Sequence, residues 1–263
     1  MNLKFTLLGC GNSSGVPAVG NYWGDCDPNE PKNRRFRCSL AVQSPETTLV
    51  IDTGADFRHQ MNAFNIQSLD GVFYTHQHSD HCHGIDDLRS FFFRNDKVAI
   101  PCYGNESTLN ELSQRFDYLF KGGNNQRYYP PIVKPCLLET HQFGVENQFN
   151  DITFIPFEMD HGTCTALGYR FKNLSYCVDM KTISEKSLQI IKGSDIWIVD
   201  GAGYHNPDNA VHANLQTLYE YNKIIGAKEV YITCLSSLMD YETLRGELPD
   251  GFFPAYDGLT FLQ

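Results

Sequence analysis

The sequence lacks the features that mark several large classes of protein. Its nine cysteines are an odd number and include no Cys-x-x-Cys pair, so neither a disulfide framework nor an all-cysteine zinc cluster is indicated. No apolar run approaches the roughly 18 residues of a membrane-spanning helix, and no membrane association is expected. Basic residues are also few, because 21 Lys and Arg face 31 Asp and Glu, for a net charge of −10. That balance weighs against broad binding to nucleic acid without excluding a local basic patch.

The composition is that of a globular protein. The chain has 263 residues, of which 41% are hydrophobic and 13% aromatic, enough for a substantial core. Its first residues read as a strand that enters a glycine loop and do not resemble a secretory signal, so we expect a cytoplasmic protein. No linker-like break interrupts the chain, and we expect one domain over residues 1–263.

Short strands alternate with helices along the chain. Apolar and β-branched runs predict strands at Phe5–Cys10, Ser39–Gln43, Thr48–Ile51, Val72–Thr75, Ile152–Phe157, Ala166–Phe171, Leu174–Val178, Ile196–Val199, Glu229–Thr233 and Leu259–Leu262. Helices are predicted at Ala55–Ala63, Ser107–Lys121, Ser184–Ile191, Ala213–Ile225 and Tyr241–Gly246, and a loop at 122–126. Two sheets packed face to face with helices outside, a four-layer αββα sandwich, fit this order. Periodicity alone does not separate that fold from other α/β arrangements.

Four of the nine histidines fall within eight residues, at His76, His78, His81 and His83. Residues two apart on an extended segment point the same way, so His76 and His78 can hold one ion. If the chain then turns into a helix, Asp80 and His81 reach a second point a few ångströms away. Imidazole and carboxylate together suit Zn²⁺, Mn²⁺ or Fe²⁺ better than Ca²⁺. The pattern therefore predicts a transition-metal site rather than a solvated histidine-rich turn.

Two residues that follow later strands can complete a pair of ion sites. His161 comes just after a predicted strand, and Asp179 ends another, where its carboxylate could bridge two ions. Each alone would more often be an ordinary loop residue. The histidine cluster makes the ligand role the better interpretation for both.

With these residues in place, the chain resembles the metallo-β-lactamase superfamily. Within it, the chain is similar to the phosphodiesterases that include ribonuclease Z and, more so, the phosphoribosyl cyclic phosphate phosphodiesterase. The resemblance covers nearly the whole chain. It includes a glycine-rich first loop (8–17), an arginine cluster (33–37), an Asp-Thr-Gly segment (52–54) and a closing segment (248–258).

The resemblance implies a role for each matching position. His76, His78 and His161 would hold the first ion, Asp80 and His81 the second, and Asp179 would bridge them. Asp52 would accept a hydrogen bond that orients a ligating histidine. His212 would lie over the metals and assist the leaving group or stabilise phosphoryl charge, whereas without the family it reads as a residue at a helix start.

Cys234 is the first departure from the family pattern. The family closes its second metal site with a histidine, and this chain has Cys234 at that position. A thiolate binds Zn²⁺ well and Mn²⁺ poorly. The second site is therefore either selective for zinc or weakened.

The second departure concerns a structural zinc site found in some relatives. Of its cysteine cluster only Cys26 remains, and the later histidine position is Ser237. We expect no structural zinc here and expect Tyr22 and Trp23 to replace it by packing.

The function implied is hydrolysis of a phosphodiester by two divalent ions, with Zn²⁺ as the expected metal and Mn²⁺ as the alternative. A hydroxide held between the ions would attack phosphorus, with Asp80 and His212 as the catalytic residues. Ser13, Ser14 and Arg89 are candidate substrate contacts, although a structural role is the alternative for each. Arg34, Arg35 and Arg37 could guide an anionic substrate or form an internally paired loop.

Neither the RNA-binding arm nor the basic surface of ribonuclease Z is evident in the sequence. A small cyclic phosphate or nucleotide-type diester is therefore the expected substrate. Processing of transfer RNA 3′ ends is the alternative within the enzymes. A degenerate, non-catalytic binder of a phosphorylated ligand is the alternative outside them. Relatives are often dimers, so a homodimer is compatible with the resemblance.

Overall fold

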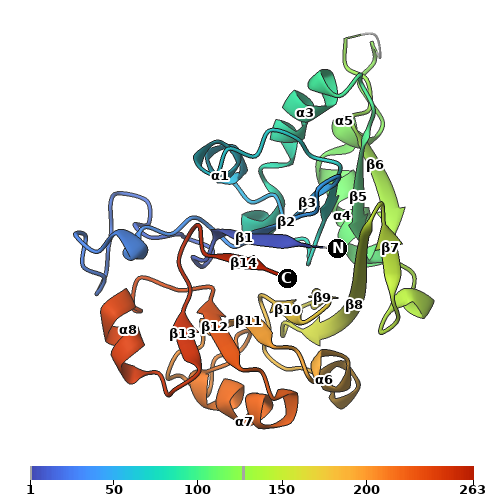
Figure 1. The fold of residues 1–263 in the computed structure, drawn as a ribbon. Coiled ribbons are helices and arrows are strands. Elements are labelled where there is room, and N and C mark those ends of the chain that lie inside the picture. The colour runs from blue at the N-terminus through green and yellow to red at the C-terminus, as the bar shows by residue number, and fades with distance from the viewer. Residues whose placement is uncertain (1, 126–127) are drawn as a thin grey trace.

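The computed structural model describes residues 2–125 and 128–263, and it consists of two seven-stranded sheets with helices outside them (Figure 1). The first sheet has the order β14-β1-β2-β3-β4-β5-β6 and the second the order β13-β12-β11-β10-β9-β8-β7. The strands of the first sheet are β1 (Lys4–Gly9), β2 (Ser39–Gln43), β3 (Thr48–Ile51), β4 (Gly71–Phe73), β5 (Ile100–Gly104), β6 (Val133–Leu137) and β14 (Thr260–Leu262). Those of the second are β7 (Asn147–Phe149), β8 (Ile152–Asp160), β9 (Thr165–Phe171), β10 (Leu174–Cys177), β11 (Ile196–Asp200), β12 (Glu229–Thr233) and β13 (Phe252–Pro254).

Both faces of the first sheet are buried, because successive apolar residues point to opposite sides of each strand. Leu7 packs between the sheets while Leu8 packs against the outer helices, and Phe73 and Val72 divide in the same way. The outer layer consists of α1 (Phe57–Ala63), α3 (Leu88–Arg94), α4 (Glu106–Arg115) and α5 (Asp117–Phe120). Short elements α2 (Ser79–Cys82), η1 (Pro31–Asn33), η2 (Ile85–Asp87) and η3 (Thr140–Gln142) lie in connecting segments.

The second sheet carries the other helical layer, made of α6 (Glu185–Ile191), α7 (Leu215–Ile225) and α8 (Tyr241–Glu247) (Figure 1). Each begins at a side-chain cap, from Ser184, Asn214 and Asp240 respectively, which satisfies a free backbone N–H of the first turn. The architecture is thus the four-layer αββα sandwich expected from the sequence. Within the described residues, no helix combines the length and the apolar character that a membrane crossing needs.

Most predicted elements are confirmed within one or two residues, and the differences have physical reasons. The helix predicted over Ser107–Lys121 is wrong as a single element, because it breaks at Phe116 (φ −120°, ψ 37°) into α4 and α5. The break lets Phe116 pack against His83 and directs Leu119 into the core. The helix predicted from Ala213 begins instead at the Asn214 cap, so His212 lies in the preceding loop. Of the predicted loop at 122–126, Gln126 lies outside the described residues.

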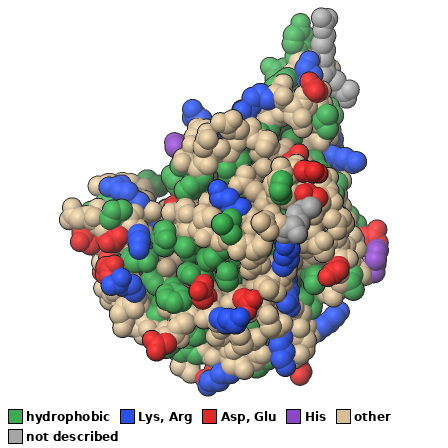
Figure 2. Space-filling model, in the orientation of Figure 1, with side chains coloured by type: hydrophobic (Ala, Val, Ile, Leu, Met, Phe, Trp, Pro, Cys, Tyr) green, Lys and Arg blue, Asp and Glu red, His purple; other side chains and the backbone are tan. Residues whose placement is uncertain are grey.

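Acidic and basic side chains alternate over the face shown in Figure 2, with a hydrophobic area where β13 and β14 lie. Phe253 and Leu262 are exposed on these two strands, which are the outermost of their sheets.

Candidate metal centre

The histidines and carboxylates singled out in the sequence follow strands of both sheets. His76 and His78 come after β4, His161 after β8 and Asp179 after β10, and Asp200 ends β11. β3 pairs parallel with β4, and β10 with β11, so each pair presents its carboxyl ends at one edge. Residues far apart in the chain meet where these two edges face each other.

Three residues at this edge turn the backbone sharply as their strands end. Asp52, Asp179 and Cys234 adopt positive φ angles of 64°, 51° and 57°. Residues other than glycine seldom adopt this conformation, which costs on the order of 1–2 kcal/mol per residue. It is retained here at three positions whose side chains all belong to the centre.

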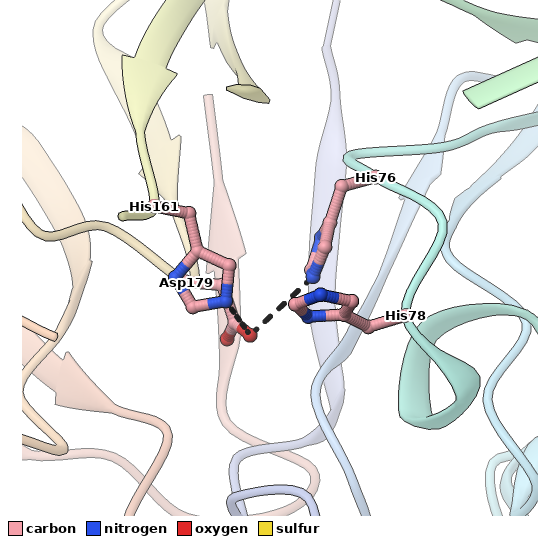
Figure 3. Close-up of side chains that lie close together, drawn as sticks. All are labelled: His76, His78, His161 and Asp179. Carbon is pink, nitrogen blue, oxygen red and sulfur yellow. Dashed lines mark ion pairs between the residues drawn. The ribbon is translucent and has the colours of Figure 1, made fainter. Parts of the chain in front are cut away.

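The first cluster consists of three imidazoles around one carboxylate (Figure 3). Nε2 of His161 lies 3.3 Å from Oδ2 of Asp179, and Nε2 of His76 lies 3.6 Å from the same oxygen. One ligand atom from each of His76, His78, His161 and Asp179 lies within 4.8 Å of all the others. This set matches the ligands that the resemblance implies for the first ion, with the shared carboxylate included.

The second cluster uses the same oxygen of Asp179. Nε2 of His81 lies 3.3 Å from Oδ2 of Asp179 and 3.4 Å from Oδ2 of Asp80. Asp80 and His81 sit on α2, the turn that the sequence predicted would carry them away from His76. Two donor sets with one common carboxylate are compatible with a pair of metal ions.

Hydrogen bonds orient three of the histidines so that Nε2 is free to bind a metal. Nδ1 of His81 donates to Asp52 Oδ2 at 2.7 Å, and Nδ1 of His161 donates to the carbonyl oxygen of Val211 at 2.8 Å. The hydroxyl of Thr75 donates to Asp52, which leaves its oxygen to accept from Nδ1 of His76 at 3.0 Å. Asp52 thus holds two ligands in place, directly and through Thr75.

The burial of these groups supports their fit to a metal. Nε2 of His76 is buried and has no hydrogen-bond partner among the described residues, a costly arrangement unless an ion completes it. Burial lowers the pKa of His76 well below its usual value, which keeps the imidazole neutral. Burial opposes ionisation of Asp179, but the surrounding His81, His76 and His161 outweigh it and hold the pKa well below the usual range. Imidazole nitrogens around an ionised carboxylate are a suitable donor set for Zn²⁺ or Mn²⁺.

Two glycines allow the histidine loop to lie against the Asp-Thr-Gly segment. A Cβ at Gly54 would collide with the carbonyl oxygen of Asp80, and a Cβ at Gly84 would collide with that of Gly54. The close approach places His81 within reach of Asp52.

His212 lies beside the first cluster, with its ring centroid 5.2 Å from that of His161. Its Nδ1 donates to Oδ2 of the buried Asp200 at 2.6 Å. Burial opposes protonation of His212, but this hydrogen bond and the charge of Asp200 raise its pKa to about 9. The sequence analysis missed Asp200. Asp200 directly follows the apolar run Ile196–Val199, and the same kind of position, directly after an apolar strand, was the signal that singled out Asp179.

Cys234 reaches the centre from the side of Asp179. Its Sγ lies 3.4 Å from Asp179 Oδ1 and 3.4 Å from the Sγ of Cys38. The sulfur is not part of the group formed by Asp80, His81 and Asp179 in the described residues. The structure therefore brings Cys234 next to the shared carboxylate without placing it among the second set of donors.

The candidate substrate contacts occupy two different places. Ser13 and Ser14 are exposed in the loop after β1, and the carbonyl oxygen of Ser13 accepts from Arg37 at 2.8 Å. Ser14 also lines a 440 Å³ pocket together with Arg34 and Arg37. Arg89 lies on α3, where its charge acts on Tyr118, and it belongs to neither ligand cluster.

A buried arginine lies beside Cys26, where the resemblance led us to expect no structural zinc. Cys26 does meet Ser237, since its Sγ lies 3.5 Å from that carbonyl oxygen. Arg35, only 3% exposed, donates to the carbonyl oxygens of Ser236 and Met239 at 3.1 and 2.7 Å. The expectation that Tyr22 and Trp23 pack there is wrong for Tyr22, which is 60% exposed. Trp23 instead lies under the guanidinium of Arg34, 4.8 Å away.

Comparison with known proteins agrees with this geometry. The model of the beta-lactamase superfamily domain matches residues 47–233. A crystal structure described as a new diphosphatase from the PhnP family superposes with a TM-score of 0.87 at 30% identity, covering 100% of this chain and 98% of that one. Among curated proteins, the octanoyltransferase of Porphyromonas gingivalis is 29% identical over 98% of this chain and 51% of its own length. The ribonuclease Z of Gemmatimonas aurantiaca is 27% identical over 54% of this chain and 43% of its own length.

The chain belongs to the metallo-β-lactamase superfamily, in its phosphodiesterase branch. It spans about half the length of the curated relatives it matches.

Proposed function

We propose that the chain is a metal-dependent hydrolase that cleaves a phosphodiester, with a small cyclic phosphate or a nucleotide-type diester as substrate. The observation that carries this proposal is the common oxygen of Asp179, which lies within 3.6 Å of a ligand nitrogen from each of His76, His81 and His161. His76, His78, His161, Asp80, His81 and Asp179 would hold a pair of divalent ions, which would supply charge neutralisation at the phosphoryl oxygens and a more acidic water.

The chain's own residues perform the remaining steps. Asp52 and Thr75 hold the ligand imidazoles in one orientation, so the site is formed before substrate arrives. His212, with its pKa of about 9, carries a proton at neutral pH. Because Nδ1 is occupied by Asp200, Nε2 is the atom that would give its proton to the departing oxygen.

The charge of the chain and its similarity to known proteins both favour a small substrate. A net charge of −10 and interspersed charges on the face in Figure 2 favour a small anion over a long polyanion. One relative that the chain matches over its full length in structure is described as a diphosphatase, which is consistent with a small phosphorylated substrate. Because one relative is a ribonuclease Z, processing of transfer RNA 3′ ends is the alternative activity.

A second candidate function is a non-catalytic binder of a phosphorylated ligand. It is favoured by one observation, the orientation of Cys234 toward Cys38 and Asp179 rather than toward Asp80 and His81. In this version only the first donor set would be filled, and the nucleophile that two ions supply would be missing.

The test combines a metal count with turnover. Protein reconstituted with Zn²⁺ or with Mn²⁺ is freed of excess ion, and metal per chain is measured by mass spectrometry. Initial rates are then compared on a 2′,3′-cyclic nucleotide, a linear dinucleotide and a precursor transfer RNA. Two zinc ions and fastest turnover of the cyclic ester support the proposal. One ion and no turnover of any ester favour the binder, which calorimetry with a phosphate ester would then measure.

The variant Asp80→Ala tests whether the metal centre is needed for turnover. Removing this ligand is expected to reduce turnover by at least about 100-fold, since metal ligands and general acids contribute on this scale. Asp86→Asn, at an exposed acid six residues further along the chain whose carboxylate accepts from Tyr118, serves as the control. Wild-type turnover in Asp80→Ala would contradict the proposal.

A further inference from the structure

The contact between the thiols of Cys38 and Cys234 is unlike any other cysteine environment in the described residues. Their sulfurs lie 3.4 Å apart, and the two side chains are 2% and 1% exposed. Cys38 directly precedes β2 of the first sheet and Cys234 directly follows β12 of the second. The thiol pair therefore spans the interface between the two sheets at the edge where the metal centre is built.

Cys234 has two competing partners at this position. On one side its sulfur contacts Oδ1 of Asp179, whose other oxygen is common to both donor sets. On the other side it contacts Cys38, whose own sulfur is otherwise near the carbonyl oxygen of Gly11 and the hydroxyl of Thr233. A sulfur bonded to a second sulfur carries no thiolate charge and is a poor zinc ligand.

We propose that Cys38 and Cys234 form a reversible disulfide that draws Cys234 away from Asp179 and so competes with metal binding at this shared carboxylate. The inference rests on the metal-binding part of the proposed function and does not require catalysis. Forming the bond draws the sulfurs from 3.4 Å to about 2.05 Å, which moves Cys234 toward Cys38 and away from Asp179. An ion held by Asp179 would in return shield the adjacent thiol of Cys234.

The oxidation balances with a peroxide as the oxidant. The sulfur of Cys234 attacks hydrogen peroxide, the O–O bond breaks, and a sulfenic acid and water result. The thiol of Cys38 then attacks that sulfur, the S–S bond forms, and the sulfenic oxygen leaves as a second water. The two thiols together lose two electrons and two protons.

The metal centre is the side from which we expect a small oxidant to approach the pair. His78 and Asp80 are partly exposed at its mouth, and Cys234 lies behind Asp179. We expect this approach to be open when no ion is bound at Asp179. Because Cys234 is only 1% exposed, we expect slow oxidation, and the reaction is followed over hours.

The experiment maps the bond directly. Metal-free protein is treated with hydrogen peroxide, quenched with catalase and digested without reduction, and linked peptides are identified by mass. The expected product joins the peptides of Cys38 and Cys234 with the loss of two hydrogens. Zinc bound after reconstitution is expected to fall by one ion per chain and to recover on treatment with a thiol reductant. Protein loaded with zinc beforehand is expected to form the link at least tenfold more slowly.

Two variants separate this thiol pair from its neighbours. Cys38→Ser is expected to give no link and to leave a sulfenic acid on Cys234 that dimedone captures. Cys10→Ser removes another buried sulfur close to Cys38 and is expected to leave the link intact.

Absence of the link in wild-type protein whose other cysteines have reacted would overturn the proposal, and so would a link that leaves zinc binding unchanged. The peptide map is independent of hydrolysis. If the Cys38–Cys234 link does not form but turnover is normal, only the disulfide proposal is rejected. If the link forms but the protein hydrolyses none of the esters, only the proposed hydrolase function is rejected.

Discussion

Nδ1 of His212 and Oδ2 of Asp200 are joined by a 2.6 Å hydrogen bond, and Asp200 also accepts from the backbone N–H groups of Met180 and Ala202 at 2.8 Å. The Asp200 carboxylate is buried and accepts three hydrogen bonds, so its position is fixed, and its bond to Nδ1 fixes the orientation of the His212 ring. This relationship connects a residue expected over the metals to one that the sequence did not single out. It also sets the protonation state that the proposed mechanism needs.

Replacing Asp200 is expected to move the pH profile. The raised pKa of about 9 means that His212 is protonated below that pH and loses its proton as the pH rises through it. In Asp200→Asn the charge that holds the proton is gone, and the pKa falls toward or below the ordinary value of 6.5. The alkaline limb of kcat/KM should therefore shift down by roughly two pH units, and the rate at pH 8 should fall at least tenfold.

The measurement is a profile from pH 5 to 10 for wild type, Asp200→Asn and His212→Ala. His212→Ala should be slow throughout and lack the alkaline limb. An unchanged limb in Asp200→Asn would show that His212 is not the proton donor.

Asp52→Asn is expected to weaken metal binding while the fold persists. Asparagine tolerates the positive φ of 64° at this position, so the backbone is spared. The neutral amide of asparagine lacks the negative charge with which Asp52 accepts hydrogen bonds from His81 and Thr75. Loss of a carboxylate that orients a ligating histidine typically costs about 10–100-fold in metal affinity. Competition with a chelator measures the zinc Kd. Asp56→Asn, which removes only the partner of Arg37 at the surface, should leave the Kd unchanged.

Arg35→Met is expected to destabilise the loop that follows Cys234. The guanidinium is buried and donates to the carbonyl oxygens of Ser236 and Met239. Loss of these two bonds costs about 1–3 kcal/mol for the carbonyl oxygen of Met239 and less for that of Ser236, which also accepts from the backbone N–H of Met239 at 3.2 Å. Urea unfolding should show a loss of roughly 2–4 kcal/mol. Arg34→Met, at an exposed residue stacked on Trp23, should lose less than about 1 kcal/mol. Equal stability of the two variants would mean that Arg35 does not hold this loop.

Metal removal is expected to lower thermal stability. An ion that binds only the folded chain stabilises it by about 2.7 kcal/mol at a free concentration 100 times its Kd. For a protein of this size that corresponds to a shift of roughly 5–10 °C in Tm. Scanning calorimetry with chelator and with zinc measures the difference. The His161→Ala variant should show a smaller shift, and a chelator without effect on wild type would argue against a resident metal.

The elements that sequence patterns predicted well are those whose signal is local. β2, β3 and β12 agree with their predicted bounds because each is a short apolar run between polar residues. β5 and β6 were missed because Pro101 and Pro135 interrupt their apolar pattern, although both strands pair in parallel in the sheet. The break at Phe116 was missed because it depends on a contact with His83, more than thirty residues away.

The sequence by itself determined the family and the chemistry of the donors, because His76, His78, Asp80 and His81 stand within six residues and their spacing alone favours a metal site. His161 and Asp179 could be added because each follows an apolar strand. Only the tertiary structure decided which partners these residues have. The bond between Asp200 and His212, the place of Arg35 behind Ser236, and the contact between Cys38 and Cys234 each join segments that no local pattern relates. The last two join the two sheets, and such contacts depend on how the sheets pack rather than on the residues near them in the chain.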